Sequence, residues 1–214
     1  MDIGFIVSVA LNFIAFILTA VGTFVMIKGI DADEHLAADG WHSIKYFTVQ
    51  SNLLYGAYAA VFAVIGLIYG SADAVPDVFY ILKYIFTVGV TLTMLTVLLY
   101  LAPVVEKSYP PLFKGANLYF HLLVPLLGVI SFCFFEKGAE ISIPQTFLGL
   151  IPFALYGVYY TVNVVAHADN GKVDMKYDWY GFVMKGVDKA AIAALIMIAA
   201  ATAICFGLRF INSL

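Results

Sequence analysis

The chain has 214 residues, of which 63% are hydrophobic and 12% are charged, with a formal net charge of −3. A soluble domain is usually about 45–50% apolar and about 25% charged. The 11 basic and 14 acidic side chains cannot cover this much apolar surface, so lipid has to cover it. The small net charge and the lack of a basic cluster exclude a nucleic-acid partner.

Six apolar runs have about the length that a membrane-spanning helix needs, roughly 20 residues. They cover residues 3–30, 47–69, 78–101, 116–135, 144–165 and 183–211. The alternating polarity of a membrane barrel is absent. The first run follows no basic segment or cleavage site, which predicts an uncleaved helix. We therefore predict an all-α integral membrane protein, a single-domain bundle of about six transmembrane helices with short loops.

Lysines are more frequent in loops one, three and five than on the opposite face, which has Lys83, Lys137 and Arg209. Because positive residues concentrate in cytoplasmic loops, we predict that the odd-numbered loops are cytoplasmic and both termini lie outside.

Polar residues at membrane depth gather at the start of the second run. Thr48, Ser51, Asn52 and Tyr55 have the spacing i, i+3, i+4 and i+7, which puts them on one helix face. Polar side chains are costly in lipid and therefore indicate a helix interface or a functional site. Structural hydrogen bonding between helices is the simpler interpretation for any single threonine.

The fourth and fifth runs carry the other candidate residues. His121 lies about 7–8 Å inside the membrane if its helix enters near residue 116 with a rise of 1.5 Å per residue. Pro125 follows one turn later and predicts a kink. Tyr156, Tyr160 and Asn163 form a stripe on the fifth run, which packing alone can also explain. In an up-down bundle, these residues share one side of the membrane with Thr48.

A hydroxyl and an imidazole at one depth suggest nucleophilic catalysis, because a neutral imidazole can take the hydroxyl proton. Asn52, Asn163 or a tyrosine hydroxyl is a candidate for orienting the imidazole or stabilising an oxyanion. A lone histidine inside a membrane is by default functional. The same stripes could instead line the cavity of a protein that binds or transports a small amphiphile. The lack of charged residues near the midplane argues against transport.

Two further patterns leave alternatives open. The first loop has His35 and His42 among acidic residues, which suggests either a metal cluster or, more simply, a solvated acidic turn. The fifth loop has the aromatic run 177–180, including Trp179, which can be an interfacial anchor or a lid over the site. We expect no metal site and no organic cofactor.

Three segments together resemble the androgen-induced-gene family of multipass membrane proteins, especially its bacterial members. They are YFTVQSNLL at residues 46–54, NLYFHLLVPLL at 117–127 and DWYGF at 178–182. Vertebrate members of that family hydrolyse fatty acid esters of hydroxy fatty acids with an intramembrane threonine nucleophile and a histidine. The resemblance implies that Thr48 is the nucleophile and His121 the base.

The resemblance and the residue pattern together predict an intramembrane lipid-ester hydrolase that acts on fatty-acyl esters through an acyl-enzyme. The expected partners are the ester substrate and the lipids of a bacterial cytoplasmic membrane. Residues expected to support the catalytic pair or contact the substrate are Gln50, Ser51, Asn52, Tyr55, Pro125, Tyr156, Tyr160, Asn163 and Trp179.

Overall fold

The computed structural model describes residues 2–32, 39–104, 111–137, 140–169, 172–183 and 187–214. These residues form helices joined by turns, and their one β-type pairing is an isolated bridge between Asp169 and Lys172. Six helical segments within them are long and apolar enough to cross a membrane. The predicted all-α membrane bundle is therefore confirmed, and the chain is an integral membrane protein.

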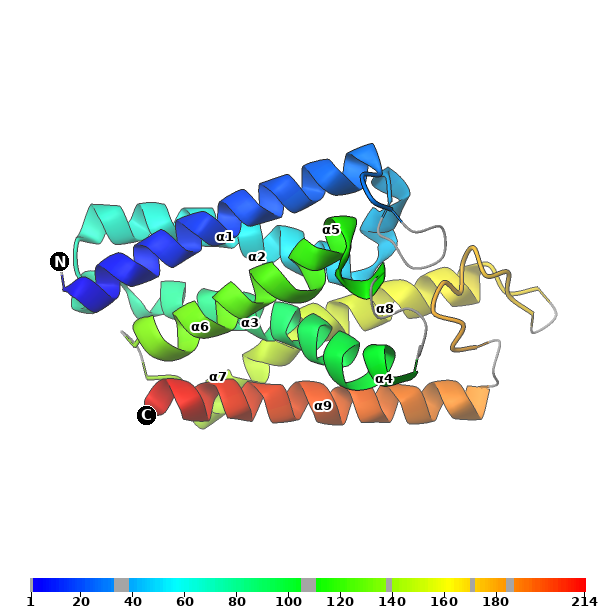
Figure 1. Cartoon of the computed structure of the whole chain (residues 1–214). Helices are drawn as coiled ribbons and strands as arrows, with labels where there is room; N and C mark the ends of the chain where they lie inside the picture. Colours follow the sequence, from blue (N-terminus) through cyan, green and yellow to red (C-terminus); the bar gives the residue numbers. More distant parts are fainter. Residues whose placement is uncertain (1, 33–38, 105–110, 138–139, 170–171, 184–186) are drawn as a thin grey trace.

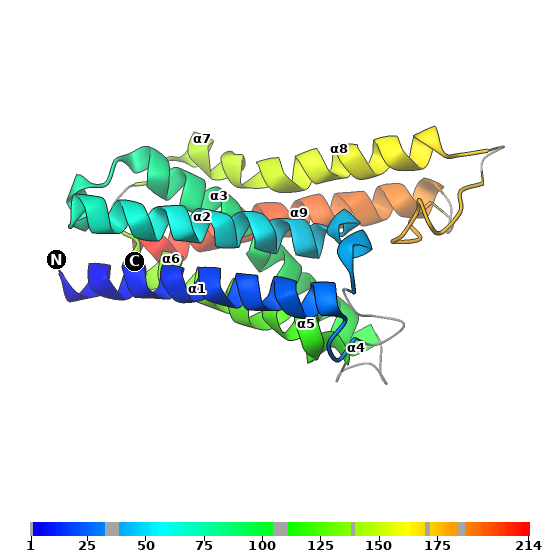
Figure 2. The ribbon, with the colours of Figure 1, turned by 90° about the horizontal axis from the view of Figure 1, so that it is seen from above.

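The six segments lie within a few residues of the predicted runs. They are Ile3–Lys28 (α1), Phe47–Tyr69 (α2), Asp77–Leu101, Gly115–Phe135, Ile143–Ala166 and Ala190–Ser213. The helices run side by side, and the N- and C-termini lie at the same end of the bundle (Figures 1 and 2). The 3-10 helix η1 (Trp41–Lys45) and the described part of the fifth loop lie at the opposite end.

Two of the spans contain π-helical segments that come just before a proline. The third span has α3 (Asp77–Thr96), the π segment η3 (Val97–Leu101) and the short helix α4 (Ala102–Val104), which contains Pro103. The fourth span has α5 (Gly115–Leu118), the π segment η5 (Tyr119–Leu123) and α6 (Val124–Phe135).

Proline explains both π segments. Because Pro125 has no N–H, it cannot donate to the His121 carbonyl four residues earlier. The helix widens instead, and the Val124 amide donates to the Tyr119 carbonyl five residues back. A π segment inside an α-helix is frequently found at a functional site.

The last two spans differ from the predicted runs in detail. The fifth span is divided into α7 (Ile143–Thr146), the 3-10 segment η6 (Phe147–Leu150) and α8 (Ile151–Ala166), because Pro152 lacks the amide that a continuous helix requires. The sixth helix, α9, covers Val187–Ser213, whereas the sequence predicted a start at residue 183, which lies in a turn.

The helices α1 and α2 pack closely against each other. A Cβ atom added to Gly56 would lie only 2.3 Å from the Thr19 hydroxyl oxygen, so the two backbones approach here as only glycine allows. Small residues permit this type of close packing between membrane helices. The contact fixes α2 against α1 and so positions the polar start of α2.

Candidate functional site

The polar face predicted for α2 is turned into the bundle. Ser51, Asn52 and Tyr55 are buried, whereas Thr48, one turn earlier, is half-buried. The Thr48 hydroxyl forms no hydrogen bond to any described residue. A half-buried hydroxyl that no described neighbour uses is available to a substrate or to a base.

Two of the supporting residues on α2 have structural partners. The Ser51 hydroxyl lies 3.1 Å from the Thr93 hydroxyl of α3, which joins the two helices. Gln50 Nε2 donates to the Ile44 carbonyl at 2.9 Å and so holds η1 against α2. Ser51 and Gln50 therefore stabilise the start of α2, which agrees with the simpler interpretation of polar residues between membrane helices.

His121 lies in the π segment η5, and only 7% of its surface is exposed. Its Nδ1 atom is 2.8 Å from the Leu112 carbonyl. A carbonyl oxygen only accepts hydrogen bonds, so Nδ1 carries the proton in the neutral ring. Nε2 consequently keeps its lone pair, which is the requirement for a general base.

Asn52 connects the segments that carry Thr48 and His121. Its Nδ2 atom donates to the Thr48 carbonyl at 2.8 Å and to the Phe120 carbonyl of η5 at 2.9 Å. Both amide protons are therefore used, which overturns the expectation that Asn52 donates to an oxyanion. Its Oδ1 atom is buried without a hydrogen-bond partner among the described residues. An unused buried acceptor is suited to bind a water or a substrate hydroxyl.

The structure brings the two predicted catalytic residues onto adjacent segments without a direct bond. Val49 of α2 and Phe120 of η5 are neighbours in sequence of Thr48 and His121, and they pack in one hydrophobic cluster. Between the residues described, there is no hydrogen bond from the Thr48 hydroxyl to the His121 ring. Such contacts are often long in an empty site and shorten when substrate binds.

The fifth loop covers the start of α2. The Tyr156 hydroxyl of α8 donates to the Lys45 carbonyl at 2.8 Å and accepts from Trp179 Nε1 at 3.0 Å. The Tyr180 hydroxyl lies 3.2 Å from that of Tyr156 and accepts from the Phe47 amide at 3.1 Å. We call Tyr156, Trp179 and Tyr180 the aromatic cap. Of the two interpretations of the run 177–180, these contacts favour a lid.

Two other residues predicted for the site have partners in the same loop. The Tyr160 hydroxyl donates to the buried Asp178 carboxylate. Asn163 Nδ2 donates to the Tyr177 carbonyl at 2.8 Å. Tyr160 and Asn163 thus anchor the fifth loop on α8, and these contacts account for them without the oxyanion role that the sequence suggested.

The N-terminus of α2 provides a group that the sequence interpretation missed. The Phe47 amide is capped by Tyr180, and the amides of Val49 and Gln50 donate to the Tyr46 carbonyl. The Thr48 amide comes too early in the helix to have an intrahelical acceptor. An unused amide at a helix N-terminus attracts negative charge, so it is a candidate oxyanion donor beside the Thr48 hydroxyl. The predicted start of this helix at residue 47 could have indicated the unused Thr48 amide.

Tyr55 belongs to a different cluster. Its hydroxyl accepts from Lys83 Nζ at 2.7 Å, and Lys83 is completely buried together with Glu136. The expectation that Tyr55 supports the catalytic pair therefore has no contact in its favour. The assignment of Lys83 to an aqueous face was wrong, because its side chain is completely buried.

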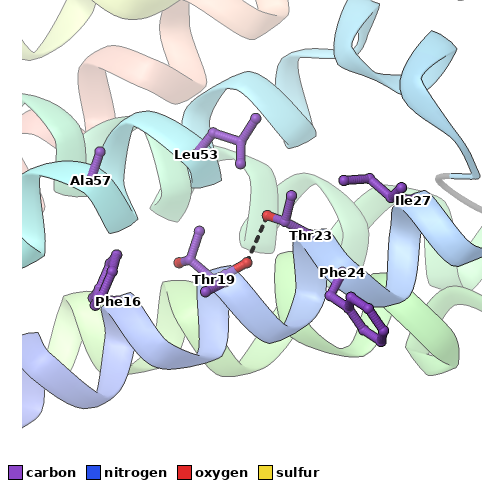
Figure 3. Close-up of a pocket in the computed structure, with 8 residues that line it drawn as sticks. Phe16, Thr19, Thr23, Phe24, Ile27, Leu53 and Ala57 are labelled. Carbon is purple, nitrogen blue, oxygen red and sulfur yellow. Dashed lines mark hydrogen bonds between the residues drawn. The ribbon is translucent and has the colours of Figure 1, made fainter.

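One hollow lies on the surface between α1 and α2, with a volume of about 410 Å³. Its lining residues are Phe16, Thr19, Ala20, Thr23, Phe24, Ile27, Leu53 and Ala57. In Figure 3 the Thr23 hydroxyl donates to the Thr19 carbonyl, so this hydroxyl is already used by its own helix. Neither Thr48 nor His121 lines the hollow, which separates it from the candidate catalytic pair.

Metal binding finds no support in the described part of the chain. No three histidine, cysteine or acidic side chains there are grouped to hold an ion. The metal alternative for the first loop involves His35, which lies outside the described residues together with the rest of 33–38.

The protein is a multipass α-helical membrane protein, and its buried histidine His121 lies on the segment next to the polar start of α2. Comparisons with protein-family models, with curated proteins and with solved structures each found no match.

Proposed function

We propose that the protein is an intramembrane hydrolase of fatty-acyl esters, with Thr48 as nucleophile and His121 as general base. Fatty acid esters of hydroxy fatty acids are the substrate class implied by the resemblance to the androgen-induced-gene family. The odd-numbered loops, and with them the site, would face the cytoplasm of a bacterial cell from its cytoplasmic membrane.

The reaction follows from the groups at the start of α2. His121 Nε2 takes the Thr48 hydroxyl proton while the oxygen attacks the ester carbonyl carbon. The Thr48 amide donates to the resulting oxyanion. The protonated His121 then gives its proton to the departing alkoxide, which leaves as an alcohol. Water, deprotonated by the same nitrogen, attacks the acyl-threonine carbonyl carbon. The bond to the Thr48 oxygen then breaks, His121 returns its proton to that oxygen, and the fatty acid is released.

The observation that carries this proposal is the hydrogen bond from His121 Nδ1 to the Leu112 carbonyl. It fixes the tautomer and leaves Nε2 as the basic atom, the arrangement that a general base needs. The Asn52 bonds to both segments support the proximity of Thr48 and His121.

A lipophilic fluorophosphonate tests the proposal, because it phosphonylates an activated hydroxyl. We expect covalent labelling of the purified chain in lipid nanodiscs. Thr48→Ala should abolish labelling, and His121→Ala should slow it about 10²–10⁴-fold, the usual contribution of a general base. Thr48→Ser should keep it. Thr23→Ala is the matched control, since that hydroxyl donates to its own helix. Equal labelling of the wild type and Thr48→Ala would refute the proposal.

The hollow between α1 and α2 favours one alternative, a non-enzymatic protein that binds or transports a small amphiphile. Its volume of about 410 Å³ is within the range of ligand sites, about 300–1,000 Å³. In that case a spin-labelled fatty acid should bind with an affinity that Ala57→Phe abolishes, while the fluorophosphonate leaves the protein unmodified. Labelling at Thr48 would decide for the hydrolase.

A further inference from the structure

The buried side chain of Asn52 has a hydrogen-bonding capacity that the contacts between helices do not use. Its exposed surface is 0%. The amide nitrogen donates to the carbonyls of Thr48 and Phe120, whereas Oδ1 has no hydrogen-bond partner among the described residues. A buried acceptor without a donor costs free energy, so this oxygen needs a donor that the described helices do not supply.

The orientation of the Asn52 amide follows from its two partners. Carbonyl oxygens only accept hydrogen bonds, so the NH2 group has to face the carbonyls of Thr48 and Phe120. Turning the amide over would place Oδ1 against these two oxygens and lose both bonds. Asn52 therefore presents a fixed acceptor, and only a group that donates a hydrogen bond is suited to the position beside it.

The same amide joins the two segments that carry the proposed catalytic pair. Thr48 precedes Asn52 by four residues on α2, a spacing that puts the two side chains on one face with roughly 5–6 Å between their Cβ atoms. Phe120, whose carbonyl the amide binds, directly precedes His121. The unused oxygen therefore lies at the junction of α2 and η5, beside the backbone of both residues.

The acyl-enzyme is the state in which this acceptor has a partner, so the inference rests on the proposed hydrolase function. Once Thr48 is acylated, its oxygen carries no proton and cannot donate to Asn52. The donor for Oδ1 then has to be the molecule that resolves the acyl-enzyme. Water has two O–H groups and can give one to His121 Nε2 and the other to Oδ1. An alcohol has one O–H group, which His121 needs.

We propose that Asn52 is a water-binding residue that directs the acyl-threonine to hydrolysis and away from acyl transfer to alcohols. The water oxygen attacks the acyl carbonyl carbon while one water proton moves to His121 Nε2 and the other stays hydrogen-bonded to Asn52 Oδ1. The bond from that carbon to the Thr48 oxygen breaks, the proton on Nε2 goes to the Thr48 oxygen, and the fatty acid leaves. The same steps with an alcohol would give a new ester.

The selection is chemical and does not depend on size. An alcohol in the position of the water turns its carbon substituent toward Oδ1, which then stays unsatisfied in the transition state. A site built to hydrogen-bond a ligand rejects an analogue that lacks the donor much more strongly than one that differs in apolar bulk. Asn52 should therefore discriminate even against methanol, the smallest alcohol.

Products formed in the presence of methanol test the proposal. The full chain in lipid nanodiscs is given an activated fatty-acyl ester, and the fatty acid and its methyl ester are measured by mass spectrometry, with Thr48→Ala as the background. Both products come from one acyl-enzyme, so their ratio does not depend on how fast Thr48 is acylated. The wild type should give mainly the acid. In Asn52→Leu the ratio of methyl ester to acid should rise roughly 10-fold or more.

Ser51→Ala is the matched control for this experiment. It also removes a buried polar group from the start of α2, the partner of the Thr93 hydroxyl, but it leaves the Asn52 oxygen in place. Its product ratio should equal that of the wild type. Turnover with an unchanged ratio in Asn52→Leu, or an equal rise in Ser51→Ala, would overturn the role of Asn52 and leave the hydrolase intact. A wild type that neither turns over the ester nor acylates Thr48 would refute the hydrolase and this inference with it.

Should Asn52→Leu fail to fold, a pair of small amines decides in the wild type. Methoxyamine has two N–H protons and N,O-dimethylhydroxylamine has one, so only the first can donate to both His121 and Asn52. After correction for their rates with the same ester in solution, methoxyamine should resolve the acyl-enzyme roughly 10-fold faster or more. Equal corrected rates would overturn the proposal.

Discussion

His121 owes its proposed role to a single backbone acceptor. The Leu112 carbonyl binds Nδ1, so the lone pair of the neutral ring is at Nε2. The sequence could indicate the histidine, because an imidazole inside a membrane segment is rare. It could not indicate the tautomer, since Leu112 is in a separate 3-10 segment, Pro111–Phe113, that only the folded chain brings against η5.

Asn52 allows a prediction for a single residue. Asn52→Asp places carboxyl oxygens against the two carbonyls of Thr48 and Phe120, so it should destabilise the protein more than Asn52→Leu, which only loses the hydrogen bonds. We expect Asn52→Leu to cost about 1–3 kcal/mol. Thermal unfolding in detergent measures the loss of stability in both variants. Gln50→Leu is the control and should lose less stability, because the hydrogen bond from Gln50 to the Ile44 carbonyl is exposed. An Asn52→Asp variant as stable as the wild type would contradict the described contacts.

Prolines set the local shape of the helices. Pro103 and Pro125 each follow a π segment, and Pro152 follows the 3-10 turn that divides the fifth span. The sequence predicted a kink at Pro125, and the structure adds a π segment that includes His121 ahead of this proline. Proline forbids the regular helix, but which irregular geometry results depends on the packing around it.

Pro125→Ala tests whether the π segment positions the base. The restored amide can donate to the His121 carbonyl, so η5 can become a regular helix and turn His121 out of register. We expect fluorophosphonate labelling to fall about 10-fold or more, while the thermal stability is kept or raised. Pro103→Ala is the control, because η3 carries no proposed catalytic group. Undiminished labelling in Pro125→Ala would show that the π geometry is unimportant.

The aromatic cap gives a second prediction for an element. Tyr180→Phe removes the hydroxyl that accepts from the Phe47 amide, so the first turn of α2 loses a cap. We expect a loss of about 0.5–1.5 kcal/mol in the free energy of unfolding. Tyr177→Phe should have little effect, because in the described structure that residue stacks on His167 through its ring. Equal stability changes in the two variants would argue against the capping role.

For the whole molecule, the order and length of the helices could be predicted because lipid imposes one simple condition, a run of about 20 apolar residues. The side-chain contacts between different helices could not be predicted from the sequence. Lys83, Asn12 and Glu136 come from distant parts of the chain, and no local pattern links them. For the same reason the sequence assigned Lys83 to an aqueous face, whereas in the structure it is buried together with Tyr80, Tyr84 and Thr87 of α3.

The orientation in the membrane is also a property of the whole chain. We predict that the odd-numbered loops are cytoplasmic, so a Lys176→Cys variant should react with an impermeant maleimide only after the cells are opened. Glu140→Cys should react in intact cells. The native Cys133 and Cys205 are buried and should give little background. The reverse pattern would show that the lysine bias does not determine the orientation here.

The proposed hydrolase reaction depends on acylation of the Thr48 hydroxyl. Incubation of the chain in nanodiscs with an activated fatty-acyl ester, followed by acid quenching and peptide mass spectrometry, measures this directly. We predict an added acyl group on Thr48 that is absent in His121→Ala. An acyl group on Ser51, or an unmodified chain that still turns over the ester, would refute the role of Thr48 as nucleophile.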